Sequence, residues 1–180
     1  MPVRLNGASA QFCHKVVTDL SQTMRHVARG PNYDSTMPAT VLHAGDAFWR
    51  PSNQLGVLNT DLGKQLEAAT LAARFWRLTP GQTSTKHRHT TQTELYVVIE
   101  GTGRMRIDED PPLTLAPHST VLVEPDTVRQ VFNDTAEDAL WLVVGTPPEL
   151  ANTLEMSDEL LAFMYPDGPR ALPPELAGGS

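Results

Sequence analysis

Two histidines and a glutamate form the most chemically suggestive pattern in the sequence. His87 and His89 are separated by one residue, and Glu94 follows five residues after the second histidine. Side chains alternate between the two faces of a β-strand, so both imidazoles lie on one face of an extended segment. The polar run 90–93 suits a turn, after which a strand over 94–99 would return the carboxylate to the imidazoles. The spacing therefore predicts a metal site suited to Fe(II), Mn, Ni or Zn.

A solvated polar loop is the alternative to a metal site. Packing does not easily explain two histidines on one strand face with a glutamate on the next strand, because a buried and unpaired carboxylate is costly. We therefore favour metal binding by His87, His89 and Glu94 over the solvated loop.

Flanking glycines make the pattern more specific. The segment 81–101 reads G-x5-H-x-H-x4-E-x6-G and resembles the first motif of the cupin superfamily. This resemblance extends over 66–147 and implies a double-stranded β-helix, a jelly-roll barrel, that holds a divalent metal ion. Cupins include dioxygenases, isomerases, epimerases, decarboxylases, storage proteins and ligand-binding modules, so the resemblance implies no single reaction.

The second cupin motif, G-x5-P-x-G-x2-H-x3-N, supplies a histidine as fourth ligand in the family and is degenerate here. Only Pro125 matches it. The other aligned positions carry Ser119, Thr127, Gln130 and Asp134. Gln130 thus stands where the histidine would be, and its amide could ligate the metal weakly, hold a bound water or orient a substrate oxygen.

The remaining sequence predicts an all-β fold. The chain has 15 prolines and 12 glycines among its 180 residues, which favours many turns and short strands over helices. We expect strands over 40–49 and 68–78 before the motif, a loop over 51–65 with room for a short helical turn in its middle, and several short strands after the motif. The predicted organisation is an N-terminal extension over 1–38, a β-barrel over 39–147, and a C-terminal helix with a loose tail over 148–180. The helix would begin after Ser157, and another is plausible over 16–27.

Strand alternation also predicts the lining of the cavity. Counting by two from Glu94 directs Tyr96 inward, and neighbouring strands add further apolar side chains. The predicted pocket residues are Trp76, Tyr96, Met105 and Phe132. Plain core packing is the alternative for each of them. An apolar, aromatic-lined cavity beside a metal suits a small aromatic or otherwise oxygenated organic molecule.

Composition excludes several partners. The net charge of −7 argues against nucleic acid and anionic membranes, which require basic surfaces. The longest apolar runs, LYVVI and LWLVV, are too short to span a bilayer. The lone Cys13 cannot form an internal disulfide. No leader pattern stands at the start, so we expect a cytoplasmic protein, and the resemblance implies a homodimer.

Two classes of function follow. In the first, the chain is a metal-dependent enzyme that polarises a substrate oxygen. The resemblance implies dioxygenation with Fe(II) and oxygen, whereas a redox-silent metal would support isomerisation or cyclisation. In the second, the chain is a non-enzymatic cupin module that binds a small ligand. The pocket would then bind metal weakly or not at all, or be a relic in a protein that acts by association.

Overall fold

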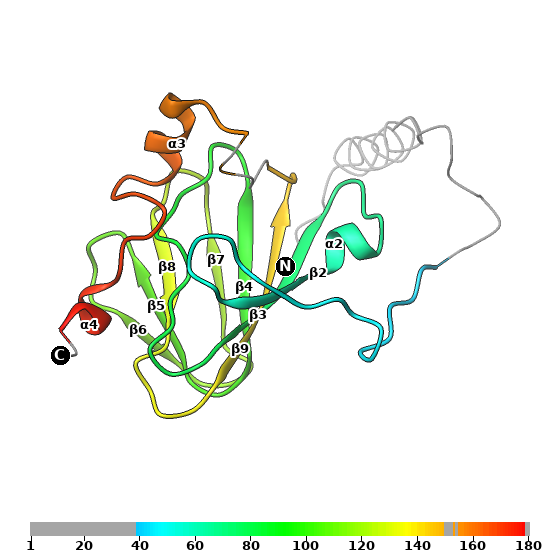
Figure 1. Ribbon diagram of the computed structural model, residues 1–180, viewed down its shortest axis with the longest axis horizontal. Helices are drawn as coiled ribbons and strands as arrows, with labels where there is room; N and C mark the ends of the chain where they lie inside the picture. The colour runs from blue at the N-terminus through cyan, green and yellow to red at the C-terminus, as the bar shows by residue number, and fades with distance from the viewer. Residues whose placement is uncertain (1–38, 150–152, 154, 179–180) are drawn as a thin grey trace, which may run out of the picture. The chain divides into compact units, whose positions relative to one another are not determined.

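The computed structural model describes residues 39–149, 153 and 155–178. Strands dominate these ranges and form two antiparallel sheets, as Figure 1 shows. The strands are β1 (Arg50–Pro51), β2 (Leu58–Asp61), β3 (Ala72–Leu78), β4 (Thr93–Glu100), β5 (Gly103–Ile107), β6 (Leu113–Leu115), β7 (Thr120–Val123), β8 (Arg129–Phe132) and β9 (Ala139–Thr146). The helices are α2 (Leu62–Gln65), α3 (Asp158–Met164) and α4 (Pro174–Ala177). The expected all-β fold is confirmed.

The larger sheet has six strands in the order β1-β2-β3-β9-β4-β7, and the smaller sheet has three in the order β6-β5-β8. Their facing sides bury the core. Tyr96 and Trp141 come from neighbouring strands of the larger sheet and pack edge to face, with ring centroids 6.3 Å apart. Met105 and Val131 meet them from the smaller sheet and are buried. One apolar core therefore holds the two sheets together.

The segment that carries the two histidines runs beside β8. His87 is paired with Arg129 in antiparallel fashion, and each residue donates its backbone N–H to the other's carbonyl at 3.0 and 2.8 Å. This pairing holds 87–89 extended, so the side chains of His87 and His89 share a face, as the alternation predicted.

Two sequence predictions before β3 are wrong in detail. The strand expected over 40–49 does not form, because the chain turns at 44–46, where the Asp46 N–H donates to the His43 carbonyl at 2.9 Å. The stretch 51–65, predicted as loop, contains β2 and α2. The edge of β3 decides this, since it offers β2 a complete antiparallel register. The predicted strand over 68–78 is confirmed from Ala72 onward.

The C-terminal segment packs against the barrel through polar contacts. Ser157 caps α3 by accepting a hydrogen bond from the Leu160 N–H, which confirms the predicted helix start. Arg88 donates from its backbone and side chain to the carbonyls of Met164 and Phe163. The predicted helix over 16–27 lies outside the described residues. Among the described helices, none has the length and apolar character needed to cross a bilayer.

Gly101, which closes the histidine motif, is required by backbone geometry. Its φ is +71°, and a Cβ would lie 2.1 Å from the Asp138 carbonyl oxygen. We expect Gly101→Ala to lower the free energy of unfolding by about 1–3 kcal/mol, because both the strained φ and the clash act in the folded state. Urea unfolding would measure this. Gly45→Ala is the control, since its Cβ would meet nothing within 4 Å. Equal effects of the two substitutions would contradict the prediction.

Arg106 and Glu175 tether α4 to β5 by two hydrogen bonds of 3.0 and 2.7 Å. The hydrogen bond from Arg106, opposed by burial, holds the pKa of Glu175 below its ordinary value of 4.5. A lowered carboxyl pKa stabilises the fold above the unfolded pKa, and this stabilisation is lost as the pH falls through the folded value. Glu175→Gln should therefore lower the free energy of unfolding by about 0.2–1 kcal/mol at pH 7 and leave it unchanged in strong acid.

Urea unfolding of Glu175→Gln at pH 7 and in acid would test this tether. Glu137→Gln is the matched control, because this exposed carboxylate makes no ion pair within the described part of the chain. A loss of unfolding free energy in Glu175→Gln that stays constant with pH would contradict the role given to the Arg106–Glu175 ion pair.

Candidate functional site

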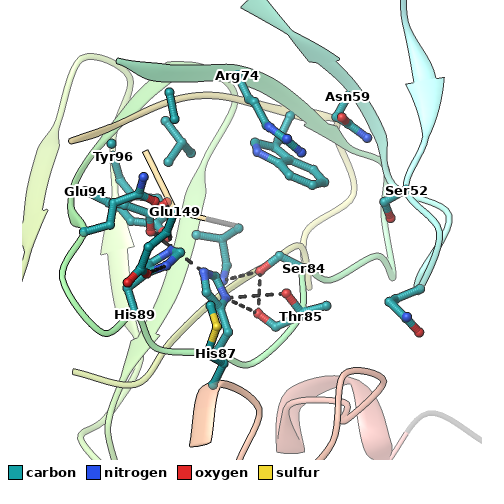
Figure 2. Close-up of a pocket in the computed structure, with 18 of the residues that line it drawn as sticks. Ser52, Asn59, Arg74, Ser84, Thr85, His87, His89, Glu94, Tyr96 and Glu149 are labelled. Carbon is teal, nitrogen blue, oxygen red and sulfur yellow. Dashed lines mark hydrogen bonds and ion pairs between the residues drawn. The ribbon is translucent and has the colours of Figure 1, made fainter. Parts of the chain in front are cut away.

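His87, His89 and Glu94 converge at one end of a pocket (Figure 2). Their ligand atoms all lie within 4.8 Å of one another. His87 and His89 pack edge to face with ring centroids 5.1 Å apart, and Glu94 reaches them from β4. The pattern predicted from sequence is therefore brought together in space.

Glu149 sets the orientation of His89. The Nδ1 of His89 lies 2.6 Å from Glu149 Oε2, and an ionised carboxylate only accepts, so Nδ1 carries the proton. Glu149 is itself held by the backbone N–H and hydroxyl groups of Thr90 and Thr91. Burial alone would raise the pKa of Glu149, but these hydrogen bonds and the one from His89 lower it below the ordinary range. The carboxylate is thus ionised at neutral pH and directs the opposite nitrogen of His89 inward.

The Nδ1 of His87 makes an equivalent contact. It lies 2.9 Å from the backbone carbonyl of Thr85, which also only accepts. In the neutral imidazole the lone pair is therefore on Nε2, which faces Glu94 Oε2 at 3.8 Å. Both histidines present Nε2 lone pairs to the same carboxylate.

Arg129 is the buried partner of Glu94. The Nε and Nη2 of Arg129 donate to Glu94 Oε2 at 3.2 and 3.0 Å, and the Tyr96 hydroxyl donates to the same oxygen at 2.6 Å. The Arg129 side chain is fully buried. These three donors occupy Oε2, which leaves Oε1 directed toward His89 Nε2 at 3.3 Å.

The charges of this cluster follow from its contacts. Burial raises the pKa of Glu94, and His87 and His89 lower it well below the ordinary range when their imidazoles are protonated. With neutral imidazoles, the buried guanidinium of Arg129 is the charge that keeps Glu94 ionised. Burial, followed by the charge of Glu94, raises the pKa of the Tyr96 hydroxyl well above its ordinary range. At neutral pH Tyr96 is therefore a hydrogen-bond donor to a carboxylate and not a general base.

These residues fit a divalent metal ion. The Nε2 of His89 is buried and has no hydrogen-bond partner, and its contact with Glu94 Oε1 lacks hydrogen-bond geometry. A buried nitrogen lone pair without a donor is costly, and a cation that accepts it removes the cost. Two imidazole nitrogens and one carboxylate oxygen are ligands for Fe, Mn, Ni or Zn, and the Nδ1 contacts are of the kind that orient metal-binding histidines.

Gln130 lies away from this cluster. The alternation along β8 directs Arg129 and Val131 toward the pocket side, and Gln130 toward the opposite side. The Gln130 amide donates to the carbonyls of Ser84 and Ala171 at 3.0 and 2.9 Å. We therefore omit Gln130 from the proposed ligand set.

The predicted pocket residues separate into two groups. Trp76 and Tyr96 line the pocket. Met105 and Phe132 are fully buried but are not among its lining residues. Met105 belongs to the core between the sheets, and the ring of Phe132 faces the Arg104 guanidinium at 5.4 Å.

Sequence reasoning missed Arg129 and Glu149. Arg129 could have been found by allowing one residue fewer after Pro125, because Arg129 and Asn133 then reproduce the H-x3-N spacing with arginine for histidine. Asn133 is fully buried, and its amide nitrogen donates to the carbonyls of Leu78 and Glu137. Glu149 lies just after β9 and is sixty residues from His89 in the sequence, so no local pattern signals it.

Removing Arg129 should leave Glu94 as an uncompensated buried charge. We expect Arg129→Met to lower the free energy of unfolding of the chelator-treated protein by about 3–5 kcal/mol. Adding Glu94→Gln should restore part of the loss, because the two side chains interact directly. Urea unfolding of both single variants and the double variant would measure the coupling. Arg77→Met is the control and should cost under about 1 kcal/mol, since its ion pairs are exposed. Strict additivity would contradict the assignment.

Comparisons with known proteins agree with this geometry. A family model described as a cupin domain matches residues 74–145. No curated protein sequence matches the chain significantly. A solved sugar phosphate isomerase of the cupin superfamily from Silicibacter pomeroyi is 25% identical, with a TM-score of 0.55 over 61% of this chain and 76% of that one.

Two other solved structures share the fold at lower identity. A structure described as a putative sugar phosphate isomerase from Acidithiobacillus ferrooxidans is 21% identical, with a TM-score of 0.52 over 59% of this chain and 74% of that one. A predicted oxalate decarboxylase from Thermotoga maritima is 16% identical, with a TM-score of 0.53 over 61% of this chain and all of that one (100%). The two facing sheets, the family-model match and these similarities together identify a cupin domain over residues 74–145.

Proposed function

We propose that this chain is a metal-dependent cupin that acts on a small, oxygenated organic molecule. His87, His89 and Glu94 would hold one divalent ion, with Fe, Mn, Ni and Zn as the candidates. The proposal depends on one observation: the buried Nε2 of His89 has no hydrogen-bond partner although it faces a carboxylate.

Each residue around the proposed ligands has a separate role. Arg129 and Tyr96 hold Oε2 of Glu94, so that Oε1 is the free ligand atom. Glu149 and the Thr85 carbonyl hold the Nδ1 protons of the two histidines. When bound, a divalent ion would supply a Lewis acid for a substrate oxygen, and with Fe(II) also a site for oxygen chemistry.

Three protein ligands leave positions open toward the pocket. Trp76, Tyr96, Met164 and Tyr165 line the pocket beside the triad and offer apolar surface to the carbon frame of a substrate. A dioxygenase reaction is the first candidate with iron, and isomerisation is the candidate with a redox-silent metal.

A non-enzymatic cupin module that binds a small ligand is the second candidate. Both carboxylates that line the pocket are already engaged: Glu94 by Arg129 and Tyr96, and Glu149 by Thr90, Thr91 and His89. A proton-transfer reaction would therefore lack a free carboxylate base among the described lining residues. Assembly as a homodimer stays a prediction.

Metal content is the direct test. Untagged protein reloaded with each candidate metal should retain about one equivalent of at least one of them by elemental analysis. His89→Ala should weaken binding at least tenfold, because it removes a ligand. Glu149→Gln should also weaken it, by about 10–100-fold, because it disturbs the contact that orients His89.

Two matched variants serve as controls for metal loss. His43→Ala removes an exposed histidine outside the pocket, and Gln130→Ala removes the amide directed away from it; both should retain metal. If the wild-type protein contains no metal after reloading, the proposed metal-dependent function is contradicted. Oxygen uptake or substrate conversion by the loaded protein would then separate the enzyme from the binding module.

A further inference from the structure

The pocket has a second polar end that the metal triad does not use. Residues of β1, β2 and β3 and the loop between the first two strands form this end, including Arg50, Ser52, Asn59 and Arg74. Figure 2 shows Arg74, Asn59 and Ser52 across the pocket from His87 and His89. A molecule long enough to span the pocket would therefore contact the triad at one end and these polar residues at the other.

Asn59 lines this second end, and its buried side chain carries an acceptor without a partner. It is 0% exposed, and its Nδ2 donates to the carbonyls of Arg50 and Val57 at 3.1 and 3.3 Å. These two acceptors fix the orientation of the amide and leave Oδ1 without a donor. Three buried side-chain polar atoms lack a partner in the described ranges, and two of them, Asn59 Oδ1 and His89 Nε2, belong to residues that line this pocket. A ligand hydroxyl or N–H would satisfy Asn59 Oδ1.

Arg74 adds a cation beside Asn59. Its neighbours along β3 direct it to the same face as Trp76, and it lines the pocket. Its Nη2 contacts Asp61 Oδ2 at 2.6 Å, which holds the side chain in place from the paired strand. No second acceptor contacts the guanidinium among residues 39–178 as far as they are described. The remaining N–H groups are available to an anion, which a guanidinium binds in a forked geometry.

Two guanidinium groups, of Arg50 and Arg74, lie at the second end of the pocket, whereas both lining carboxylates lie at the triad end. These carboxylates, of Glu94 and Glu149, are engaged by protein donors. Arg50 contacts the Pro51 carbonyl and the Asn53 amide oxygen, and no carboxylate within the described part of the chain. Asp61 is paired with Arg74 and does not line the pocket. A divalent ion at the triad would add two further positive charges.

The size of the pocket limits the ligand. It encloses about 190 Å³. This is less than the roughly 300–1,000 Å³ typical of drug-sized sites. A short chain of carbons with oxygen substituents fits this space.

We propose that the pocket binds a small hydroxylated carboxylate. Its carboxylate pairs with Arg74, a hydroxyl donates to Asn59 Oδ1, and an oxygen at the other end faces His87, His89 and Glu94. Only this last contact rests on the proposed function. Arg74 and Asn59 are thus specificity residues at the end of the pocket away from the triad.

Isothermal titration with small probes tests this inference. Glycerate carries a carboxylate and hydroxyls, whereas glycerol lacks the carboxylate and propionate lacks the hydroxyls. Glycerate should bind wild type at least tenfold more tightly than either. Arg74→Gln should weaken glycerate binding at least tenfold and leave glycerol binding within twofold of wild type. Equal binding of glycerate and glycerol, or an unchanged affinity in Arg74→Gln, would overturn the proposal.

Matched variants separate recognition from folding. Arg77→Gln, on the same strand but outside the pocket, should bind glycerate within twofold of wild type. Asp61→Asn keeps the guanidinium and should retain glycerate binding. If Arg74→Gln does not fold, Arg74→Lys replaces it and should lose affinity, because lysine lacks the fork. Retained affinity in Arg74→Lys would then count against the proposal. Tighter binding of glycerol phosphate than of glycerate would overturn the choice of carboxylate over phosphate.

The same titrations on chelator-treated protein distinguish this inference from the proposed function. Arg74 and Asn59 do not belong to the triad, so preference for glycerate over glycerol should persist without metal. Protein that loads one equivalent of metal but shows no such preference would overturn this inference alone. Protein that shows the preference but never loads metal would overturn the proposed function alone.

Discussion

Burial of the Glu94 carboxylate is the constraint on which the site depends. An ionised carboxylate away from water is costly unless charge and hydrogen bonds compensate it. Arg129 and Tyr96 provide this compensation at Oε2. Glu94 belongs to the larger sheet and Arg129 to the smaller one, so the ion pair also links the two sheets at the end of the barrel that holds the pocket.

The contacts around the two histidines fix their orientation in the same way. Each Nδ1 is held by an acceptor from a different part of the chain, the Thr85 carbonyl for His87 and the Glu149 carboxylate for His89. Tautomer and ring orientation are therefore determined before any ion binds, which lowers the cost of organising the site. The Glu149 carboxylate also holds the turn at Thr90 and Thr91 that joins the histidine segment to β4.

The pocket carries polar groups at both ends and also has apolar lining residues. The triad lies at one end, and Arg74 with Asn59 lies at the other, while Trp76 and Tyr165 add aromatic surface. Such an arrangement selects a ligand by length and by the chemistry of its two ends. The three protein ligands proposed for the metal would leave coordination positions for a ligand oxygen at the triad.

The sequence by itself determined the features that depend on local spacing. Alternation on short extended segments was sufficient to predict the shared face of His87 and His89 and the inward direction of Tyr96. The resemblance of the first motif to cupins implied the barrel. Tertiary structure decided what depends on register and on distant segments. One residue fewer after Pro125 exchanges the two faces of β8, so that Arg129 and not Gln130 faces Glu94. Glu149 and Asn59 reach the pocket from other strands or loops, and no local pattern carries information about contacts that only the folded sheets create.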